Sequence, residues 1–350
     1  MNKKLLAIAV AAFVAAPAIA SAQTTLFGQF KYEVGYIDSG FPTGENVDGD
    51  PTYAGVEFDN NFVHSTKGTR IGLHGSEDLG GGLQAIYRFQ GGMGNVNSGV
   101  ASSSFALNEE NWVGVQGGFG TLQLGRSDTA MKKTGGNPFR AFTDTLAEPS
   151  VIPVRTGRAD GIHYTSPNIA GFTGYLTVEP NGVETDAYFS VGASYAAGPF
   201  LVTAAVEQAP DTGTYSAGIN DVTNYQVGAK WNFGQGDVGL LYQMYERRPG
   251  GADPGDAPKF DTDVFVIPVN YKVTPNVNLR AAVLYADPDV GDDFTNFALG
   301  AQYMFSNRTE AFVNVWVDDA ERQTLTPGNN GPQAISTDST QFGFGLRHSF

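Results

Sequence analysis

The chain has 350 residues, with 21 basic against 36 acidic side chains, no cysteine, and 24 Phe, 15 Tyr and 3 Trp. The acidic balance argues against nucleic-acid binding, which needs basic patches. Disulfide scaffolds and Cys-ligated metal sites are excluded, and so many aromatic residues argue against disorder. The charged share of 16% is low beside the roughly 25% of soluble domains, and after the N-terminus no apolar stretch approaches the ~18 residues that indicate a transmembrane helix.

The N-terminus has the pattern of a signal peptide. Lys3 and Lys4 precede an apolar core at residues 5–16, and small residues at 20–22 form a cleavage site. A retained membrane anchor is the alternative, but this core is shorter than the ~20 residues that span a bilayer. We predict Sec-type export and cleavage after Ala22, which divides the chain into a signal peptide, 1–22, and one mature domain, 23–350.

Period-two alternation of apolar and polar residues recurs throughout the mature chain, which predicts β-strands. The segments at 224–233, 277–285, 296–305 and 341–350 all alternate in this way. In the first strand one face carries Leu26, Gly28, Phe30, Tyr32, Val34 and Tyr36, and the other carries Gln29, Lys31 and Glu33. A soluble sandwich of antiparallel sheets would also alternate.

Three features favour a membrane barrel over a sandwich. The segments run for about 9–12 residues, which is long enough for a tilted strand to cross a bilayer. Aromatic residues gather at the ends of the apolar faces, as in the girdles of membrane barrels. The connections alternate between short and long, as periplasmic turns and extracellular loops do.

Counting the connections gives the number of strands. Seven are short, at 77–82, 117–120, 166–171, 197–199, 234–236, 274–276 and 306–308. Eight long ones begin near Asp38, Gly92, Asp128, Glu179, Ala209, Arg248, Asp287 and Asp318. Fifteen connections predict an all-β, sixteen-stranded antiparallel transmembrane β-barrel in which the first strand pairs with the last.

The most specific segments of the mature chain are residues 25–29, 70–83, 112–120, 166–172 and 345–350. They resemble the general diffusion porins of Gram-negative outer membranes, in particular the sixteen-stranded proteobacterial branch, and the resemblance covers the whole mature chain. It implies an outer-membrane homotrimer surrounded by lipid and lipopolysaccharide. It also implies that Phe350 is an assembly signal read by the barrel-assembly machinery.

The resemblance further implies that the third long loop, 128–160, folds into the lumen and narrows the pore. It gives Arg140, Asp144 and Glu148 of this loop as constriction residues. Solvated loop charges without such a role are the alternative for Asp144 and Glu148. Length alone does not select this loop, because the segment 38–68 is nearly as long.

The alternating pattern also indicates which basic residues of the pore wall face the acidic residues of the third loop. Lys31, Arg70 and Arg88 fall on polar positions of three successive strands, and a cation at the lipid-facing midplane would cost about 2–4 kcal/mol. We therefore expect them to face inward. Arg126 shares its face with Leu122 and Leu124, so it reaches the lumen only if a bulge intervenes.

The sequence gives no sign of catalysis or of a metal or other cofactor. His64, His74, His163 and His348 lack the spacing of a zinc site, and no nucleophile elbow of a hydrolase is present. Residues 287–293 are rich in Asp but lack the Gly at the sixth position and the closing Glu of a calcium loop.

These observations predict a passive pore for ions and small hydrophilic solutes, filtered by charges at the third loop. A substrate-selective channel is one alternative, although a sugar channel would need more aromatic residues on the lumen face than Phe312 and Trp316. A plugged structural or adhesive surface barrel is the other alternative.

Overall fold

The computed structural model describes residues 23–39, 61–93, 105–107, 109–147, 157–180, 187–209, 219–249, 260–289, 293–319, 321–324, 333–336 and 339–350. The predicted signal peptide and Glu148 lie outside these ranges. Within them, no helix is both long and apolar enough to cross a membrane.

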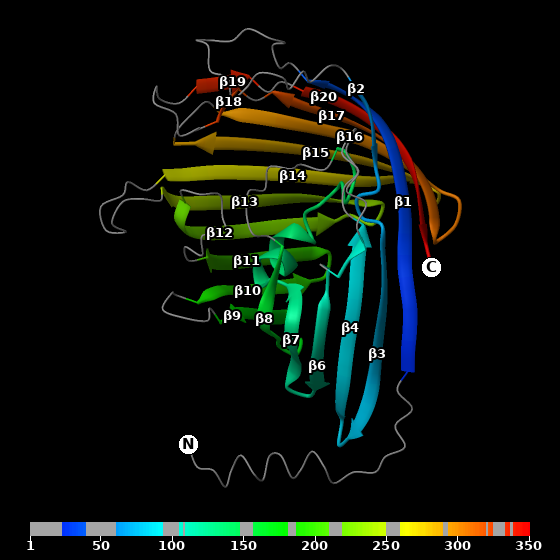
Figure 1. Cartoon of the computed structure of the whole chain (residues 1–350), viewed down its shortest axis with the longest axis vertical. Coiled ribbons are helices and arrows are strands. Elements are labelled where there is room, and N and C mark those ends of the chain that lie inside the picture. The colour runs from blue at the N-terminus through cyan, green and yellow to red at the C-terminus, as the bar shows by residue number, and fades with distance from the viewer. Residues whose placement is uncertain are drawn as a thin grey trace.

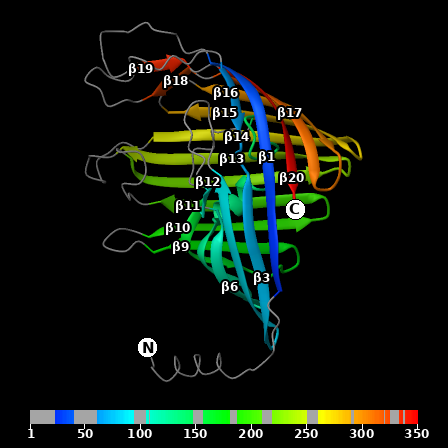
Figure 2. The ribbon, with the colours of Figure 1, turned by 45° about the vertical axis from the view of Figure 1, so that its right-hand side comes forward.

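Sixteen long strands form one antiparallel sheet in which each strand pairs with its neighbours in the chain (Figure 1). They are β1 (Gln23–Ser39), β3 (Arg70–Gly80), β4 (Leu83–Met93), β6 (Asn111–Gly117), β7 (Gly120–Asp128), β8 (Arg158–Thr165), β9 (Phe172–Glu179), β10 (Tyr188–Ala197), β11 (Phe200–Ala209), β12 (Ile219–Asn232), β13 (Gly236–Pro249), β14 (Phe260–Thr274), β15 (Val277–Pro288), β16 (Phe294–Met304), β17 (Thr309–Asp319) and β20 (Ser339–Ser349). Figure 2 shows β9 to β14 stacked in sequence order.

The sheet closes on itself through β1. The lower part of β1 pairs with β3, from Gln23 opposite Ser76 to Gln29 opposite Arg70. Its upper part pairs with the last strand, β20, from Gln29 opposite Ser349 onward. Closure removes the unpaired strand edges that lipid would penalise. The predicted sixteen-stranded antiparallel barrel is confirmed.

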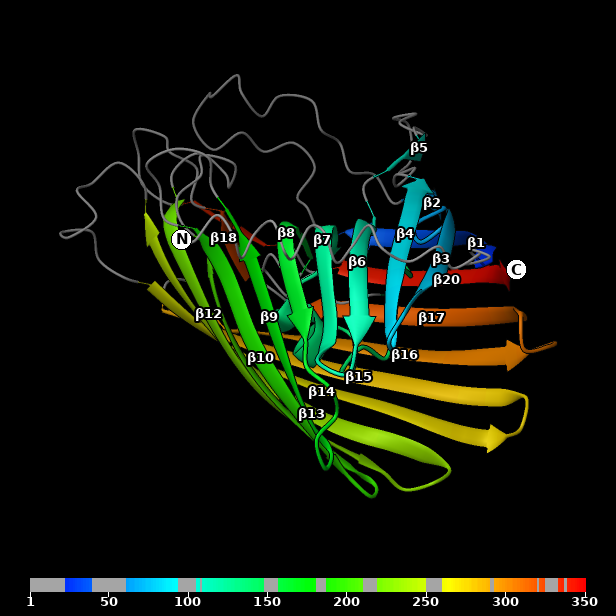
Figure 3. The same cartoon turned by 90° about the horizontal axis from the view of Figure 1, so that it is seen from below.

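The described parts of the connections contain four short strands and one helical turn. β2 (Asn61–Ser65) pairs with β1, and β5 (Phe105–Ala106) pairs with the end of β4. β18 (Glu321–Thr324) and β19 (Gln333–Ser336) form a separate hairpin. The helical turn η2 (Lys132–Gly136) belongs to the connection between β7 and β8, and it lies inside the ring of strands (Figure 3).

Burial alternates along the strands with the predicted parity. On β17, Val315 and Val317 are 37% and 38% exposed, whereas the intervening Trp316 is 3% exposed. The exposed large side chains of the strands are mainly Phe, Leu, Val, Ile and Tyr, and the buried polar side chains belong mainly to the inner face. This distribution is typical of a barrel whose outer solvent is lipid.

The short turns and the aromatic girdles follow the sequence pattern. Gly80, Gly81 and Gly82 all have positive φ at the turn between β3 and β4, a conformation that glycine adopts at little cost. At the end of the barrel that carries the short turns, the rings of Trp231 and Phe233 lie 5.5 Å apart and belong to the predicted girdle.

Candidate functional site

The connection between β7 and β8 crosses the inner wall of the barrel, and we call it the third loop. It begins after Asp128, the last residue of β7, and its described part ends at Ala147. Its first contacts are with β9, where the Ala130 N–H donates to Thr177 Oγ1 at 3.2 Å, and with β10 and β12. The Met131 N–H donates to Ser190 Oγ at 2.9 Å, and the Gln226 amide donates to the Met131 carbonyl at 2.8 Å and to Thr134 Oγ1 at 2.6 Å.

The middle of the third loop packs two aromatic rings against the wall. Phe139 is buried in a cluster with apolar residues of β13, β14 and β15, including Leu241 and Val264. Phe142 is fully buried and packs with Trp316 of β17. The guanidinium of Arg280 lies over the Phe142 ring, 5.0 Å from its centre, which is a favourable cation–π geometry.

The far end of the described loop is held by charged groups of β1 and β20. Arg347 donates to the Thr143 carbonyl at 3.0 Å, and Lys31 donates to the Asp144 carbonyl. Glu33 accepts from the Leu146 N–H at 3.0 Å and pairs with Lys31 at 2.9 Å. The loop therefore runs along the wall from β9 to β1.

The strands on the other side of β1 carry two partly exposed arginines. Arg70 on β3 lies 3.8 Å from an Asp144 carboxylate oxygen and donates to Gln29 Oε1 at 3.4 Å. Its side chain is 33% exposed. Of the loop residues predicted at the constriction, Asp144 is thus brought beside both Arg70 and Lys31.

Arg88 on β4 is the most firmly oriented of these cations. Its Nε lies 2.9 Å from Glu110, and two of its nitrogens donate to Gln90 Oε1 at 3.1 and 2.7 Å. Its guanidinium also lies 4.5 Å from the centre of the Phe27 ring. These contacts fix the direction of a charge that is still 33% exposed.

Two predicted wall residues are placed differently from expectation. Lys31 points inward, but the third loop covers it completely, so it holds the loop and does not face open water. For Arg126, a place at the constriction would require a bulge in β7. The pairings of β7 with β6 and β8 contain no bulge, so Arg126 stays on the face of Leu124. It pairs there with Asp160 at 2.8 Å, outside the lumen.

The root of the third loop is an ionic cluster around Asp128. Its carboxylate lies 2.7 Å from Lys132 Nζ and 3.1 Å from Arg158 Nε, and Arg158 also pairs with Glu109 at 2.6 Å. Burial lowers the pKa of the Lys132 ammonium, although Asp128 partly opposes this change. Arg140 is half-buried on the loop near Lys132.

The loop anchors other than Lys31 and Asp144 were not singled out from the sequence. Glu33, Arg280 and Arg347 all lie on the lumen parity of their strands, so alternation could have identified them as inward charges. It could not show that the loop reaches them.

His163 and the lumen aromatic residues Phe312 and Trp316 are buried in the wall. His163 is fully buried and bonds to Thr177 and to two backbone carbonyls. Phe312 and Trp316 are also buried, so they offer no stacking surface to a solute. Within the described ranges no group of three or more His, Asp or Glu could hold a metal ion.

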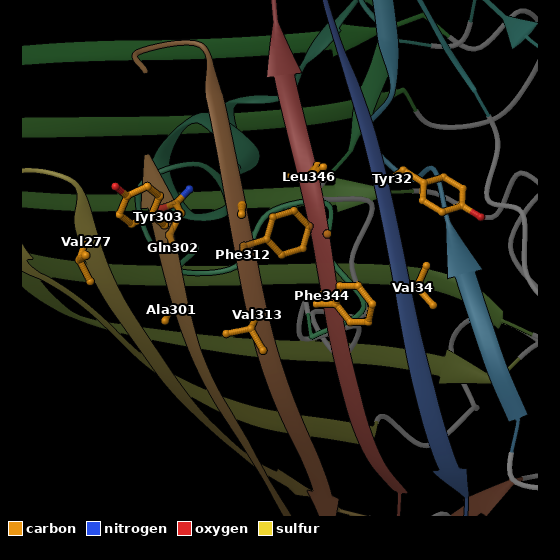
Figure 4. A pocket seen from close by; sticks show the side chains of 12 residues that line it. Tyr32, Val34, Val277, Ala301, Gln302, Tyr303, Phe312, Val313, Phe344 and Leu346 are labelled. Carbon is orange, nitrogen blue, oxygen red and sulfur yellow. The ribbon is translucent and has the colours of Figure 1, made fainter. Parts of the chain in front are cut away.

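A groove of about 650 Å³ lies on the lipid-facing side of the barrel, over β15, β16, β17, β20 and β1 (Figure 4). Its lining includes the outward side chains of Tyr32, Val313, Phe344 and Leu346, and it reaches Phe312 past Gly345. Because it opens toward lipid, it is separate from the lumen.

Comparison with known proteins gives a consistent result. The sequence profile of the Gram-negative porin family matches residues 7–323. The major outer membrane protein P.IB of Neisseria lactamica is 30% identical over 371 aligned residues, which cover 100% of both chains. Its counterpart in a strain of Neisseria meningitidis serogroup B is 28% identical over 369 residues, again covering 100% of both chains.

Two solved structures share the fold at low sequence identity. The anion-selective porin from Comamonas acidovorans has a TM-score of 0.69 at 20% identity, covering 94% of this chain and 100% of that one. The trimer form of Vibrio cholerae OmpT has a TM-score of 0.66 at 15% identity, covering 94% and 99%.

Proposed function

Because the chain belongs to the Gram-negative porin family and forms a passive diffusion channel in the outer membrane, we propose that ions and small hydrophilic solutes pass its lumen beside the third loop. The solute gradient supplies the free energy, and no residue acts as a catalyst. The observation that carries this proposal is that the described part of the third loop follows the inner wall while Arg70 on β3 and Arg88 on β4 stay partly exposed.

The filter in this proposal consists of charges at the level of the loop. Arg70 and Arg88 provide positive charge on the wall, and Asp144 and Glu110 are their acidic neighbours. Arg140, which lies near Lys132 at the start of the loop, is a further cation of the proposed filter. Glu148 lies outside the described residues and remains a prediction. A permeating ion interacts with fixed charges of this kind at close range, which is how rings of charged side chains select ions.

The assembly around the pore is also part of the proposal. We expect a homotrimer, a state that one structural neighbour with the same fold adopts. We expect the chain to be exported and cleaved after Ala22. We expect the barrel-assembly machinery to recognise Phe350 and insert the barrel, which then contacts lipopolysaccharide. Each rests on the sequence pattern and on family membership.

Planar-bilayer recording tests the proposal. Purified protein should give large, ohmic single-channel currents, and neutral polymers should reduce the current only below a size limit set by the constriction. A folded, inserted barrel that carries no current would support a plugged structural barrel instead. Strong block by one solute class would support the substrate-selective alternative.

A further inference from the structure

The inner wall carries glycines at the places where the third loop touches it. Gly192 on β10, Gly228 on β12, Gly239 on β13, Gly300 on β16 and Gly343 on β20 all occupy the lumen parity of their strands. Glycine is unfavourable inside a strand unless another group must approach closely. The atoms beside these glycines include side chains of the third loop.

Phe139 shows the fit most clearly. A methyl group on Gly228 would overlap the Phe139 ring, and one on Gly239 would lie 2.9 Å from the same ring. Contacts below 3.0 Å force an atom to move, so both strands need glycine for this ring to reach the wall. At Gly228 the other close atom is the Thr203 hydroxyl oxygen, at 3.0 Å, and no backbone atom interferes.

The same fit recurs along the loop. A methyl group on Gly300 would lie 2.8 Å from the Phe142 ring. One on Gly35 would lie 2.5 Å from Leu146 Cδ1. One on Gly343 would lie 2.6 Å from Glu33 Oε1, the carboxylate that holds the loop, and in ordinary contact with Leu146 Cδ1 at 3.4 Å. At the start of the loop, a methyl group on Gly192 would lie 3.0 Å from Thr134 Cγ2.

Lumen-facing glycines on strands away from the loop have different neighbours. Gly72 on β3 lies against Phe27 and wall backbone, and Gly114 on β6 lies against backbone of β7. Contact between a lumen-facing glycine and the third loop is therefore found on the strands that the loop crosses, and Gly72 and Gly114 show that it is not a general feature of the inner face.

We propose that Gly35, Gly192, Gly228, Gly239, Gly300 and Gly343 form a track on which the third loop is seated, and that this track sets how far the loop stands out from the wall. The inference rests on the proposed function, because it matters for permeation only if solutes pass beside this loop. In it the glycines are positioning residues. They act through the loop and touch no solute.

The test substitutes Gly228, because its two nearest atoms both belong to the Phe139 ring and none of its three nearest atoms is a backbone atom. Gly228→Ala should displace Phe139 toward the lumen and lower the single-channel conductance. Phe139→Leu, which shortens the displaced side chain, should restore the conductance in the double variant. Gly174→Ala is the matched control, because Gly174 is also in a strand interior, on β9, but its nearest neighbour would be 3.8 Å away.

A second readout follows the loop itself and is independent of conduction. The chain has no cysteine, so Ala141→Cys places one thiol at a buried loop position. A water-soluble thiol reagent should modify this cysteine faster in the presence of Gly228→Ala than in the presence of Gly174→Ala. If Gly228→Ala fails to assemble, Phe139→Trp introduces the same overlap from the loop side without changing the strand.

The outcomes separate the track from the proposed function. Unchanged labelling and conductance in a folded Gly228→Ala barrel would overturn the track, as would changes that Phe139→Leu does not reverse. Faster labelling with unchanged conductance would support the track and overturn the proposal that permeation is limited beside this loop.

Discussion

Glu33 connects the wall to the third loop through two contacts, to Lys31 and to the Leu146 N–H. Both charged side chains are fully buried, and removal of one partner from such a pair costs about 3–5 kcal/mol. We predict that Glu33→Ala loosens the end of the loop and gives noisier open-channel currents with a lower thermal stability. Glu33→Gln, which keeps an acceptor for the Leu146 N–H, should be milder. Equal noise in Glu33→Ala and wild type would contradict this role.

Arg88 is the wall charge whose removal should change permeation with the least effect on folding. It is partly exposed, its partner Glu110 is also partly exposed, and the buried Gln90 keeps a hydrogen bond to Glu109. We predict that Arg88→Ser raises the conductance or shifts the ion preference toward cations. Bilayer recording and a melting curve of the same sample measure both effects. A folded variant with unchanged conductance and selectivity would refute the assignment.

Residue-level prediction from the sequence depended on side-chain parity. The face on which a strand residue lies follows from its position in the alternating pattern alone. This pattern indicated that Arg70 and Arg88 point inward and that Arg126 lies on the same face as Leu124. It could not show that Lys31 is covered or that Glu33 and Arg347 hold the loop, because these facts depend on a contact between segments far apart in the chain. The prediction that Asp144 lies at the constriction rested on the resemblance to the porin family.

The last strand joins the first through Phe350, the C-terminal residue. The Phe350 N–H donates to the Gly28 carbonyl at 3.0 Å, and the Gly28 N–H donates back to the Phe350 carbonyl at 3.1 Å. Deletion of Phe350 removes these closing bonds as well as the predicted sorting signal. We predict a lower outer-membrane yield and more periplasmic aggregate, measured by fractionation, with Phe350→Tyr as the control. Normal assembly of the deletion would argue against both roles.

At the scale of strands, the sequence predicted the barrel well because every spanning strand must present one face to lipid and one to water. This requirement leaves a period-two pattern in β1, β17 and β20, and glycine marks the turns between strands. The short strands β2, β5, β18 and β19 were not predicted. They are stabilised by contacts within or beside loops, where no second solvent imposes alternation.

At the scale of the whole molecule, we predict two sets of charge at different depths. The sequence places an excess of acids in the long loops, with Glu45, Asp48 and Asp50 in the first and Asp287 and Asp289 in the seventh. Near the third loop, Arg70 and Arg88 are partly exposed cations. Charges in open water act over about 10 Å at 0.1 M salt but only about 3 Å at 1 M.

We therefore predict a cation preference at low salt that weakens or reverses as the salt concentration approaches 1 M. The loop acids enrich cations at low ionic strength, whereas charges beside the constriction lie closer to a permeating ion and are screened less. Reversal potentials under a fixed salt ratio at both ionic strengths measure this change. A constant permeability ratio would mean that a single set of charges dominates.

Chemical modification at position 88 tests most directly whether the inner wall around Arg88 lines the conducting path. Arg88→Cys introduces one thiol into a cysteine-free chain, and Phe89→Cys places the same thiol on the adjacent, lipid-facing position. We predict that a negatively charged thiol reagent lowers the single-channel current of Arg88→Cys stepwise and shifts its selectivity toward cations. A positively charged reagent should shift the selectivity back toward wild type, and neither should change the current of Phe89→Cys. Complete modification of Arg88→Cys, verified by mass, with no change in current or selectivity would contradict the account.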